Sequence, residues 1–476
     1  MRTLIDARYV VAYRDGGHVI LEDAQVVVDD ATITYVGRDH AGPVDRRIDA
    51  RDKLLTPGFV AVHCHVTNSP LTKSFLEDEG NPLHYMSGLY EYLTITDVSP
   101  EDALISARAS LVELTKSGVT TVSELGANAS EGIVEMAAAM GLRAYVVPMY
   151  KSARWDTPDG RRVRYEWRDD EGMPALEQAI AFIEKHDGTH GGRIRCYLGP
   201  AQIDTCTPKL LRRTAELAES LDTRVQIHAG QAVVEFQEIT RRHGLTPIEF
   251  LRDVGLLNRR LIIGHCIFVS GYPALGYPGD HDLELLAASG ASVAHCPWVF
   301  ARRGIPMHSY PRYRKLGINV ALGTDTFPQD MLHEMRWAAV LGKVVEGDPR
   351  VSTAADVFTS ATLGGARALG RDDLGRIAPG SRADLVLFDL ETLSMAPVRD
   401  PIKNLVYSAS RHDVHTVMVD GRIVVEAGRM AGVDERAVVR DLQAATERFW
   451  QRVPERDWAG RSVDRISPPS FPMERA

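Results

Sequence analysis

The sequence predicts an α/β fold, a (β/α)8 TIM barrel joined to a small composite β-domain. The middle of the chain alternates short apolar segments with helical stretches, which is the pattern of a parallel barrel. Both ends of the chain are instead rich in strand-like alternation with Gly and Asp turns. No GxGxxG motif follows the first apolar segment of the middle region, which disfavours a doubly wound sheet.

Eight apolar segments are the predicted barrel strands. They span 59–66, 119–125, 143–149, 193–199, 224–230, 261–267, 291–297 and 318–325. Helical stretches separate them, most clearly at 100–116, 207–221 and 234–243. The barrel is therefore expected to occupy residues 57–365.

The two ends of the chain are predicted to form one β-domain, from residues 1–56 together with 366–432. Alternating segments occur near the start and again at 383–390 and 415–430, where Asp420-Gly421 predicts a hairpin turn. Residues 433–476 are expected to form a separate C-terminal helix and tail. The helix, over 434–453, is amphipathic, which suits packing or a homodimer contact.

Length and composition exclude several classes of protein. The chain has 476 residues, a formal net charge of −9 and no apolar stretch of 18 residues, so neither a nucleic-acid nor a membrane partner is expected. Five cysteines are too few for a disulfide framework, and charged residues interrupt the apolar ones at the N-terminus. We expect a soluble, cytoplasmic, homo-oligomeric protein that acts on a small molecule.

Two connections are too long to be plain linkers. The first, 67–98, and the second, 150–175, are rich in aromatic residues, and loops at the carboxyl ends of barrel strands often form lids or substrate walls. An ordinary surface excursion is the alternative for 150–175. We expect Trp155 in that connection to contact an apolar or aromatic part of the substrate.

The histidines gather at strand ends. His63 and His65 lie two apart, so their side chains share a face of the first strand. The other predicted site residues end four later strands: His228, His265, His295 and Asp325. A single strand histidine is usually a core residue, but several at one barrel mouth suit a metal such as Zn²⁺, Fe²⁺, Mn²⁺ or Co²⁺. For His295, bracing the site by hydrogen bonds remains the alternative to binding substrate.

Five motifs give the sequence a family resemblance. PGFVAVHCH, VQIHAG, IIGHC, VAHCP and VALGTD, in that order, resemble the metal-dependent amidohydrolase superfamily. Within it the chain is similar to the chlorohydrolase/aminohydrolase branch of triazine hydrolases and nucleobase deaminases. The late segments ATLGGARALG, LGRIAPGSRADLVLFD and VMVDGRIV extend the resemblance over roughly residues 1–432.

The resemblance implies roles for individual residues. It makes His63, His65, His228 and Asp325 the ligands of one divalent ion, zinc in the first place. It places His265 over the bound water and makes Asp325 the group that carries the proton. No Lys stands at the end of the fourth strand, where two-metal members have one, so we expect a single metal ion.

One position departs from the deaminases of this branch. They carry HxxE on the fifth strand, whereas this chain has His228-Ala229-Gly230-Gln231. Gln231 can hydrogen-bond but cannot donate a proton and recover it near neutral pH. Glu235, on the next helix, is expected to point elsewhere. Gln202 and Asp204 are expected to face the mouth and bind substrate.

The predicted reaction is hydrolysis of a non-peptide C–N bond by a metal-activated hydroxide. Gln231 favours an amide, urea or carbamate, because such a carbonyl needs polarisation rather than protonation of a ring nitrogen. The phenylurea and thiocarbamate hydrolases of the same superfamily make this reaction class plausible. The alternative is a heteroaromatic aminohydrolase of a purine, pyrimidine or triazine, in which Glu124, Asp204 or Glu235 supplies the proton. A non-catalytic structural homologue is the minor alternative.

Overall fold

A computed structural model describes residues 1–96, 98–126 and 129–474. A barrel of eight strand positions occupies the middle of the chain, as predicted. Its strands are β5 (Phe59–Cys64), β6 (Val119–Gly126), β7 (Arg143–Tyr150), β10 (Ile194–Arg195) with β11 (Gly199–Pro200), β12 (Val225–Ala229), β13 (Leu261–His265), β14 (Ser292–His295) and β15 (Asn319–Leu322).

The barrel closes through parallel pairings all the way round. Neighbouring strands pair in the order β10-β7-β6-β5 and β12-β13-β14-β15. Isolated bridges join these two sheets, Leu198 with Val225 on one side and Cys64 with Asp325 on the other. The second bridge uses two backbone hydrogen bonds, from His65 N to Asp325 O at 2.8 Å and from Asp325 N to His63 O at 3.0 Å. Closure therefore brings the end of β15 directly beside the end of β5.

The fourth strand position differs from the prediction. The sequence predicts one strand over 193–199, but the structure has two short strands, β10 and β11, separated by three residues. The backbone N–H of Cys196 donates to the carboxylate of Asp187 at 2.8 Å instead of to a neighbouring strand. This side-chain acceptor interrupts the ladder.

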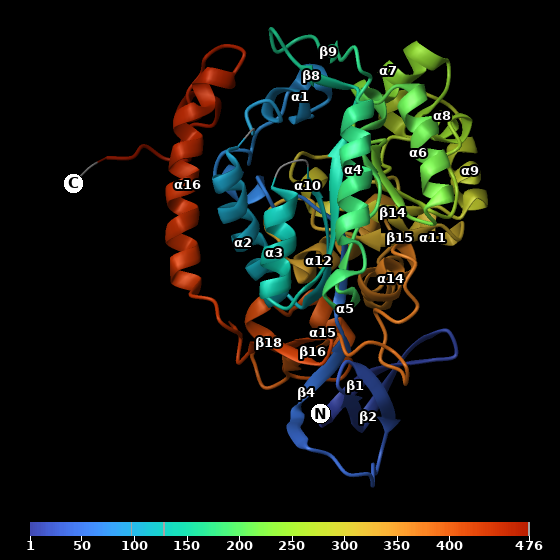
Figure 1. The fold of residues 1–476 in the computed structure, drawn as a ribbon, viewed down its shortest axis with the longest axis vertical. Helices are drawn as coiled ribbons and strands as arrows, with labels where there is room; N and C mark the ends of the chain where they lie inside the picture. The colour runs from blue at the N-terminus through green and yellow to red at the C-terminus, as the bar shows by residue number, and fades with distance from the viewer. Residues whose placement is uncertain (97, 127–128, 475–476) are drawn as a thin grey trace.

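Helices surround the barrel (Figure 1). The principal ones are α2 (Pro100–Lys116), α3 (Ser130–Ala139), α4 (Met173–His186), α6 (Pro208–Ser220), α7 (Val233–His243), α8 (Pro247–Asp253), α9 (His281–Ser289), α10 (Pro297–Ala301), α11 (Tyr310–Lys315) and α12 (Met331–Glu346). Ser99 and Thr207 cap α2 and α6 by accepting backbone N–H bonds, and each is followed by Pro at the first helical position.

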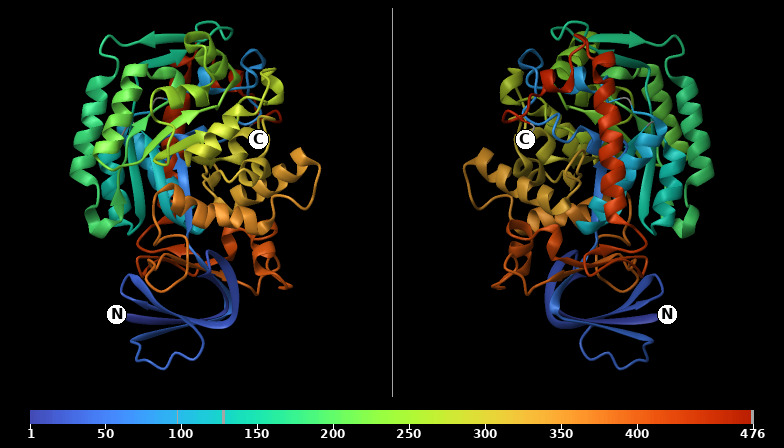
Figure 2. Two further views of the ribbon diagram at one scale, coloured as in Figure 1. Left: turned by 90° about the vertical axis from the view of Figure 1, so that its right-hand side faces the viewer. Right: turned by 90° about the vertical axis from the view of Figure 1, so that its left-hand side faces the viewer.

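The two ends of the chain share one eight-stranded sheet. Its strand order is β19-β18-β17-β16-β4-β1-β2-β3. The N-terminal strands are β1 (Arg2–Arg14), β2 (Gly17–Asp29), β3 (Thr32–Gly37) and β4 (Arg46–Pro57), and the C-terminal ones are β16 (Leu385–Asp389), β17 (Val414–Val419), β18 (Arg422–Glu426) and β19 (Arg429–Met430). Figure 2 shows this sheet at one end of the molecule, below the barrel. The exact domain boundaries given above stay predictions.

A buried ion cluster joins the barrel to this sheet. Arg143, at the start of β7, donates from Nε and Nη2 to the carboxylate of Asp384 at 2.8 and 3.1 Å, and also to Asp420. All three residues are almost fully buried. The cluster therefore holds the eight-stranded sheet against the end of the barrel at which the barrel strands begin.

The long connections contain their own elements. The first includes the short helix α1 (Leu89–Tyr92), and the second forms the hairpin β8 (Ala153–Asp156) and β9 (Arg164–Trp167). Figure 1 shows α1, β8 and β9 at the end of the barrel away from the eight-stranded sheet. Both connections thus cover the end where the barrel strands terminate.

The C-terminal helix α16 (Glu435–Arg456) lies along α2 (Figure 1). The sequence predicts it over 434–453. Its residues Ala445, Phe449 and Val453 are buried in an apolar cluster with Leu71 and Phe75 of the first long connection. Among the described residues, no helix is long and apolar enough to cross a membrane.

Candidate metal centre and active site

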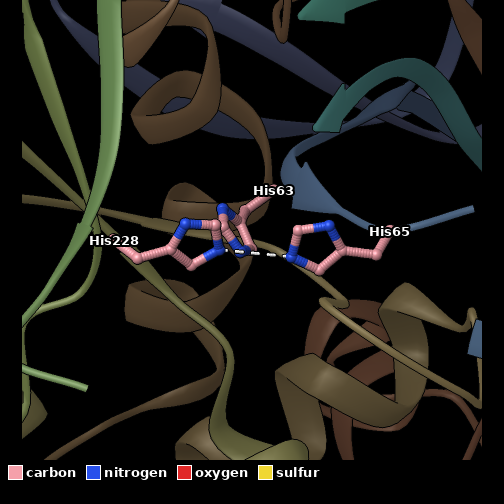
Figure 3. Close-up of side chains that lie close together, drawn as sticks. All are labelled: His63, His65 and His228. Atoms are coloured by element: carbon pink, nitrogen blue, oxygen red, sulfur yellow. Dashed lines mark hydrogen bonds between the residues drawn. The ribbon is translucent and has the colours of Figure 1, made fainter. Parts of the chain in front are cut away.

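Three predicted histidines meet at the carboxyl ends of two barrel strands. His63 lies in β5, His65 follows it, and His228 lies in β12; one ligand nitrogen from each lies within 4.8 Å of the others. Nε2 of His65 is 3.2 Å from Nε2 of His228 (Figure 3). Imidazole nitrogens that converge in this way suit a borderline divalent cation.

Hydrogen bonds to backbone carbonyls orient two of these rings. Nδ1 of His65 lies 2.6 Å from Leu125 O, and Nδ1 of His228 lies 2.6 Å from Ala201 O. Because a carbonyl only accepts, both Nδ1 atoms carry the proton and both Nε2 atoms keep a free lone pair. Burial lowers the pKa of His228 to about 3, which keeps its ring in the neutral form that binds metal.

His63 is held differently. Its Nδ1 contacts the side-chain amide of Gln226 at 3.1 Å, and its Nε2 has no hydrogen-bond partner among the described residues. Burial lowers its pKa well below the usual value, and the neighbouring histidines act in the same direction. A buried, neutral imidazole with a free nitrogen facing two others fits a metal ligand.

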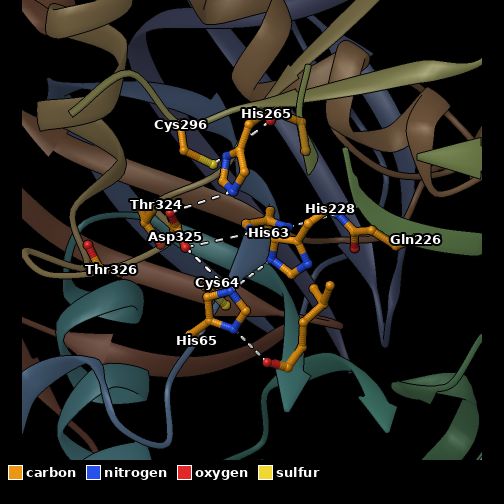
Figure 4. A network of polar contacts seen from close by, with 12 residues as sticks. His63, Cys64, His65, Gln226, His228, His265, Cys296, Thr324, Asp325 and Thr326 are labelled. Atoms are coloured by element: carbon orange, nitrogen blue, oxygen red, sulfur yellow. Dashed lines mark hydrogen bonds and ion pairs between the residues drawn. The ribbon is translucent and has the colours of Figure 1, made fainter. Parts of the chain in front are cut away.

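Asp325 supplies the carboxylate of the cluster. Its Oδ1 lies 3.4 Å from Nε2 of His65 and 3.7 Å from Nε2 of His63. Its Oδ2 lies 3.9 Å from Nε2 of His265 (Figure 4). The structure therefore brings together all four predicted metal ligands, and it places His265 beside them.

The backbone at this end of the barrel is strained. Asp325 has φ 55° and His265 has φ 76°, in the left-handed region that side chains other than Gly rarely adopt. Such conformations cost on the order of 1–3 kcal/mol each and gather at functional sites. Here they turn both side chains toward the histidine cluster.

A second overlapping group contains a residue that the sequence analysis did not select. His63, His265 and Cys296 also have ligand atoms within 4.8 Å of one another. Burial raises the pKa of the Cys296 thiol well above its usual value, which disfavours the thiolate that would bind a metal. The set with Asp325 therefore suits a divalent ion better. Cys296 directly follows the strand that ends in His295, and this position could have identified it from the sequence as a candidate ligand.

A cavity of about 250 Å³ opens beside the cluster. His65, His228, His265 and Asp325 line it, and so do Gln202 and Gln231. The rest of its wall is largely apolar and comes from the first long connection and from α10 and the residues after it, with Leu76, Leu89, Tyr92, Leu93, Val98, Val299, Phe300 and Ile305 among the lining residues. The first connection is thus a wall of the site, as predicted.

Glu235 does not line the cavity, which agrees with the expectation that it points elsewhere. Its carboxylate turns back toward the end of β12 and accepts hydrogen bonds from Gly230 N at 2.5 Å and from Gln231 N at 3.4 Å. Gly230, with φ 67°, reverses the chain so that the start of α7 faces the strand it follows. Burial, together with the nearby carboxylate of Asp204, raises the pKa of Glu235 well above its usual value, and its carboxyl lies directly behind Gln231.

Asp204 and Trp155 lie behind the cavity wall. Oδ2 of Asp204 accepts from Nε1 of Trp155 at 2.9 Å and from the hydroxyl of Tyr165 at 2.8 Å. Neither Asp204 nor Trp155 is among the cavity-lining residues. This arrangement does not fit the expected direct contact with substrate, because their polar atoms already bond each other. The aromatic residues of the second connection instead anchor the β8–β9 hairpin to the barrel.

His295 also lies outside the main cavity. It is buried, it lines a small neighbouring void with Phe300, and its ring stacks at 5.9 Å on Tyr310. Burial lowers its pKa to about 3. This position does not fit direct contact with substrate, and Nδ1 of His295 has no hydrogen-bond partner among the described residues, so bracing by hydrogen bonds stays a prediction. Glu124, another candidate proton donor, is likewise absent from the cavity lining.

Two charged residues at the cavity escaped the sequence analysis. Arg302 and Arg303 follow α10, and both line the cavity. The signal was a pair of adjacent arginines shortly after the seventh barrel strand, at the end where barrel sites form. In a chain with so many arginines this signal is weak.

The sequence matches a known family and a set of curated relatives. The profile of the Amidohydrolase family matches residues 54–424. A 5'-deoxyadenosine deaminase of Methanothermobacter thermautotrophicus is 31% identical over 433 residues, which cover 90% of this chain and 94% of the relative. A 5-methylthioadenosine/S-adenosylhomocysteine deaminase of Pyrococcus abyssi is 31% identical over 88% of this chain and 93% of its own length.

Solved structures share the fold over almost the whole chain. An adenosine deaminase from Xanthomonas campestris with bound zinc superposes with a TM-score of 0.80 at 26% identity and covers 94% of this chain and 98% of its own. A mutant of atrazine chlorohydrolase from Arthrobacter aurescens, in complex with zinc and atraton, superposes with a TM-score of 0.79 at 23% identity. It covers 93% of this chain and 100% of its own. These likenesses confirm the predicted barrel architecture.

Proposed function

Because the chain belongs to the amidohydrolase family, we propose that it uses one divalent metal ion to hydrolyse a non-peptide C–N bond of a small molecule. The metal-dependent hydrolase class follows from the family, and the choice of bond and substrate is our proposal. The observation that carries it is the convergence of three imidazoles and one carboxylate beside a cavity that His65, His228 and Asp325 line.

We assign His63, His65, His228 and Asp325 as the ligands and zinc as the ion. The fit rests on the free Nε2 atoms of His65 and His228, on the partnerless Nε2 of His63 and on the nearby Asp325 carboxylate. When bound, the ion supplies Lewis acidity and lowers the pKa of a coordinated water. A zinc-bearing solved relative with a TM-score of 0.80 supports the choice of zinc.

We assign proton transfer to Asp325 and stabilisation of the developing negative charge to His265. Asp325 is buried, and its carboxylate lies 3.4–3.9 Å from the Nε2 atoms of three histidines. We assign it to take the proton from the attacking water and to return it to the leaving nitrogen. His265, 3.9 Å from Asp325, is positioned to hydrogen-bond the oxygen on which negative charge develops.

In this proposal Gln231 favours a carbonyl carbon over a heteroaromatic ring carbon as the reaction centre. It lines the cavity, whereas Glu124, Asp204 and Glu235, the three acids that we considered as proton donors, do not. A side-chain amide orients a substrate but does not protonate a ring nitrogen. We therefore favour a carbonyl centre, in an amide, urea or carbamate.

Deamination of a heteroaromatic amine is the second candidate. It is favoured by relatives such as the two deaminases above, and by the raised pKa of the Glu235 carboxyl behind Gln231. In this case the proton of Glu235 would reach the substrate through a water or a shift of the Gln231 side chain. An adenosine-type amine would then be the first substrate class to test.

One screen separates the two candidates. Zinc-loaded protein is assayed with N-acyl amino acids, aryl ureas and carbamates on one side and with adenosine derivatives, aminopyrimidines and aminotriazines on the other. The favoured proposal predicts turnover of the carbonyl set, with amine or ammonia released from its C–N bond. Turnover confined to the ring amines would establish deamination, and no metal-dependent turnover in either set would contradict both.

We also propose a cytoplasmic, homo-oligomeric enzyme. All five cysteines are unpaired and buried, which suits a reducing compartment. The oligomeric state is tested by analytical ultracentrifugation, in which a single species of 52.5 kDa would contradict a homodimer.

A further inference from the structure

Two arginines face the substrate cavity without an ion-pair partner. Arg302 and Arg303 follow α10, which lies in the central part of the molecule below α1 (Figure 1). No carboxylate among the described residues lies within 4.0 Å of either guanidinium. Unpaired arginines at a half-buried position carry a desolvation cost that only a partner offsets.

The hydrogen bonds of the two side chains are incomplete. Arg302 donates to Thr326 Oγ1 at 3.3 Å and stacks on Phe327, but its Nε and Nη1 have no acceptor among the described residues. Arg303 donates to Val299 O at 3.2 Å, and its Nε has no acceptor in the same part of the chain. Planar donors left free in this way match the two oxygens of a carboxylate.

The position of Arg303 points across the cavity. A Cβ added at Gly88 would lie 3.6 Å from its Nη2, so the guanidinium reaches the wall formed by the first long connection. Burial lowers the pKa of Arg303 to about 10, which still leaves it positively charged at neutral pH. The side chain therefore remains a cation at the edge of the substrate space.

The lining carries more positively than negatively charged side chains. Its charged side chains other than histidine are Arg302, Arg303 and Asp325, and the buried ring of His228 is neutral. Glu77, Asp325 and Glu334 lie near Arg302 and partly offset its desolvation, and burial raises the pKa of Glu334 well above its usual value. A divalent ion at the Asp325 site would add two further positive charges.

We propose that Arg302 and Arg303 bind an anionic oxygen group of the substrate, a carboxylate that is separate from its scissile C–N bond. This inference rests on the proposed function, since it names the substrate class of that same site. Within the favoured reaction class it selects N-acyl or N-carbamoyl derivatives that carry a free carboxylate. The apolar side chains of the cavity wall contact the part of the substrate between its carboxylate and its scissile C–N bond.

The test is a binding measurement, so that it does not depend on turnover. Isothermal titration calorimetry compares 3-phenylpropionate with its neutral analogue 3-phenylpropanamide on zinc-loaded wild type, Arg302→Gln and Arg303→Gln. We expect wild type to prefer the acid, and each substitution to weaken acid binding on the order of 10–100-fold while amide binding is unchanged. Arg350→Gln, at a side chain that is 88% exposed, is the matched control and should change nothing.

Two results would overturn the inference. The first is wild type with no preference for the acid over the amide. The second is an acid affinity that is the same in wild type and in folded Arg302→Gln and Arg303→Gln proteins, which would mean that the metal alone binds the carboxylate. If a Gln variant does not fold, the Lys variant at the same position keeps the charge and should keep part of the acid preference, and a Lys variant without it would also overturn the inference. Acid binding without hydrolysis of any screened compound would leave this inference standing and remove the proposed function instead.

Discussion

The carboxylate of Asp325 and the imidazole of His265 face each other across the barrel mouth, with Oδ2 of the one 3.9 Å from Nε2 of the other. The two residues end strands that are not neighbours in the barrel, and each reaches this position through a left-handed backbone. The pair stands beside the three-histidine cluster and at the cavity. Asp325 and the three histidines are the ligands that we propose, and His265 is the residue that we propose to act on the reacting oxygen.

The first prediction concerns His265. His265→Asn should keep its metal but lower kcat on the order of 10²–10³-fold, the effect of losing one hydrogen-bond donor to a developing oxyanion. Asn is chosen because it tolerates the left-handed backbone of this position. Steady-state kinetics and metal analysis are measured on the same preparation, with His281→Asn on an outer helix as the control. Loss of metal in parallel with loss of activity would make His265 a ligand.

The second prediction concerns Gln231. Gln231→Glu would add a second carboxylate to the cavity that Asp325 already lines, and like charges raise at least one pKa. We expect kcat/KM for a urea or amide to fall at least ~10-fold, the equivalent of one pKa unit. The same assay on an aminopyrimidine gives the contrasting outcome: a variant that gains ammonia release over an already active wild type would favour deamination.

The third prediction concerns the pH dependence of stability. Burial raises the pKa of Glu124 from 4.5 to about 8, while its Oε2 accepts a hydrogen bond from Val66 N at 2.7 Å. Because the folded-state pKa is raised, Glu124 makes its full contribution to the stability of the folded state below pH 4.5. This contribution is lost as the pH rises toward 8, because between these pH values the carboxyl ionises only in the unfolded chain. Glu124→Gln keeps the hydrogen-bond acceptor and removes the titration. Its free energy of unfolding relative to wild type should therefore rise between pH 5 and pH 9, as measured by urea denaturation; a constant difference would contradict the assignment.

The fourth prediction concerns the buried contact between the barrel and the eight-stranded sheet. Arg143→Met would leave the buried carboxylates of Asp384 and Asp420 without their common partner. Breaking such a buried pair typically costs about 3–5 kcal/mol. Arg350→Met, which breaks an exposed pair with Asp348, should cost no more than ~1 kcal/mol. Equal effects of the two substitutions would show that the Arg143 cluster does not hold the parts together.

Much of the site was predictable because strand period and barrel geometry act together. His63 and His65 share a face by their spacing, and the end of a barrel strand places His228 and Asp325 at the same mouth. The hydrogen bonds that Glu235 accepts from the backbone of Gly230 and Gln231 were not predictable, because they depend on the left-handed turn at Gly230. The bond between Trp155 and Asp204 joins residues 49 positions apart and depends on how the β8–β9 hairpin folds over the barrel. Arg302 and Arg303 gave only a weak signal, since adjacent arginines are ordinary on a surface.

The most direct test of the account is the metal content of purified protein, measured by inductively coupled plasma mass spectrometry alongside activity. We predict about one divalent ion per chain in wild type, and strong loss of both metal and activity in His63→Ala and His228→Ala, with His281→Ala unchanged. Restoring zinc to a chelator-treated wild type should restore activity, because the ligands remain in place. A His63→Ala protein that is free of metal and fully active would contradict the account.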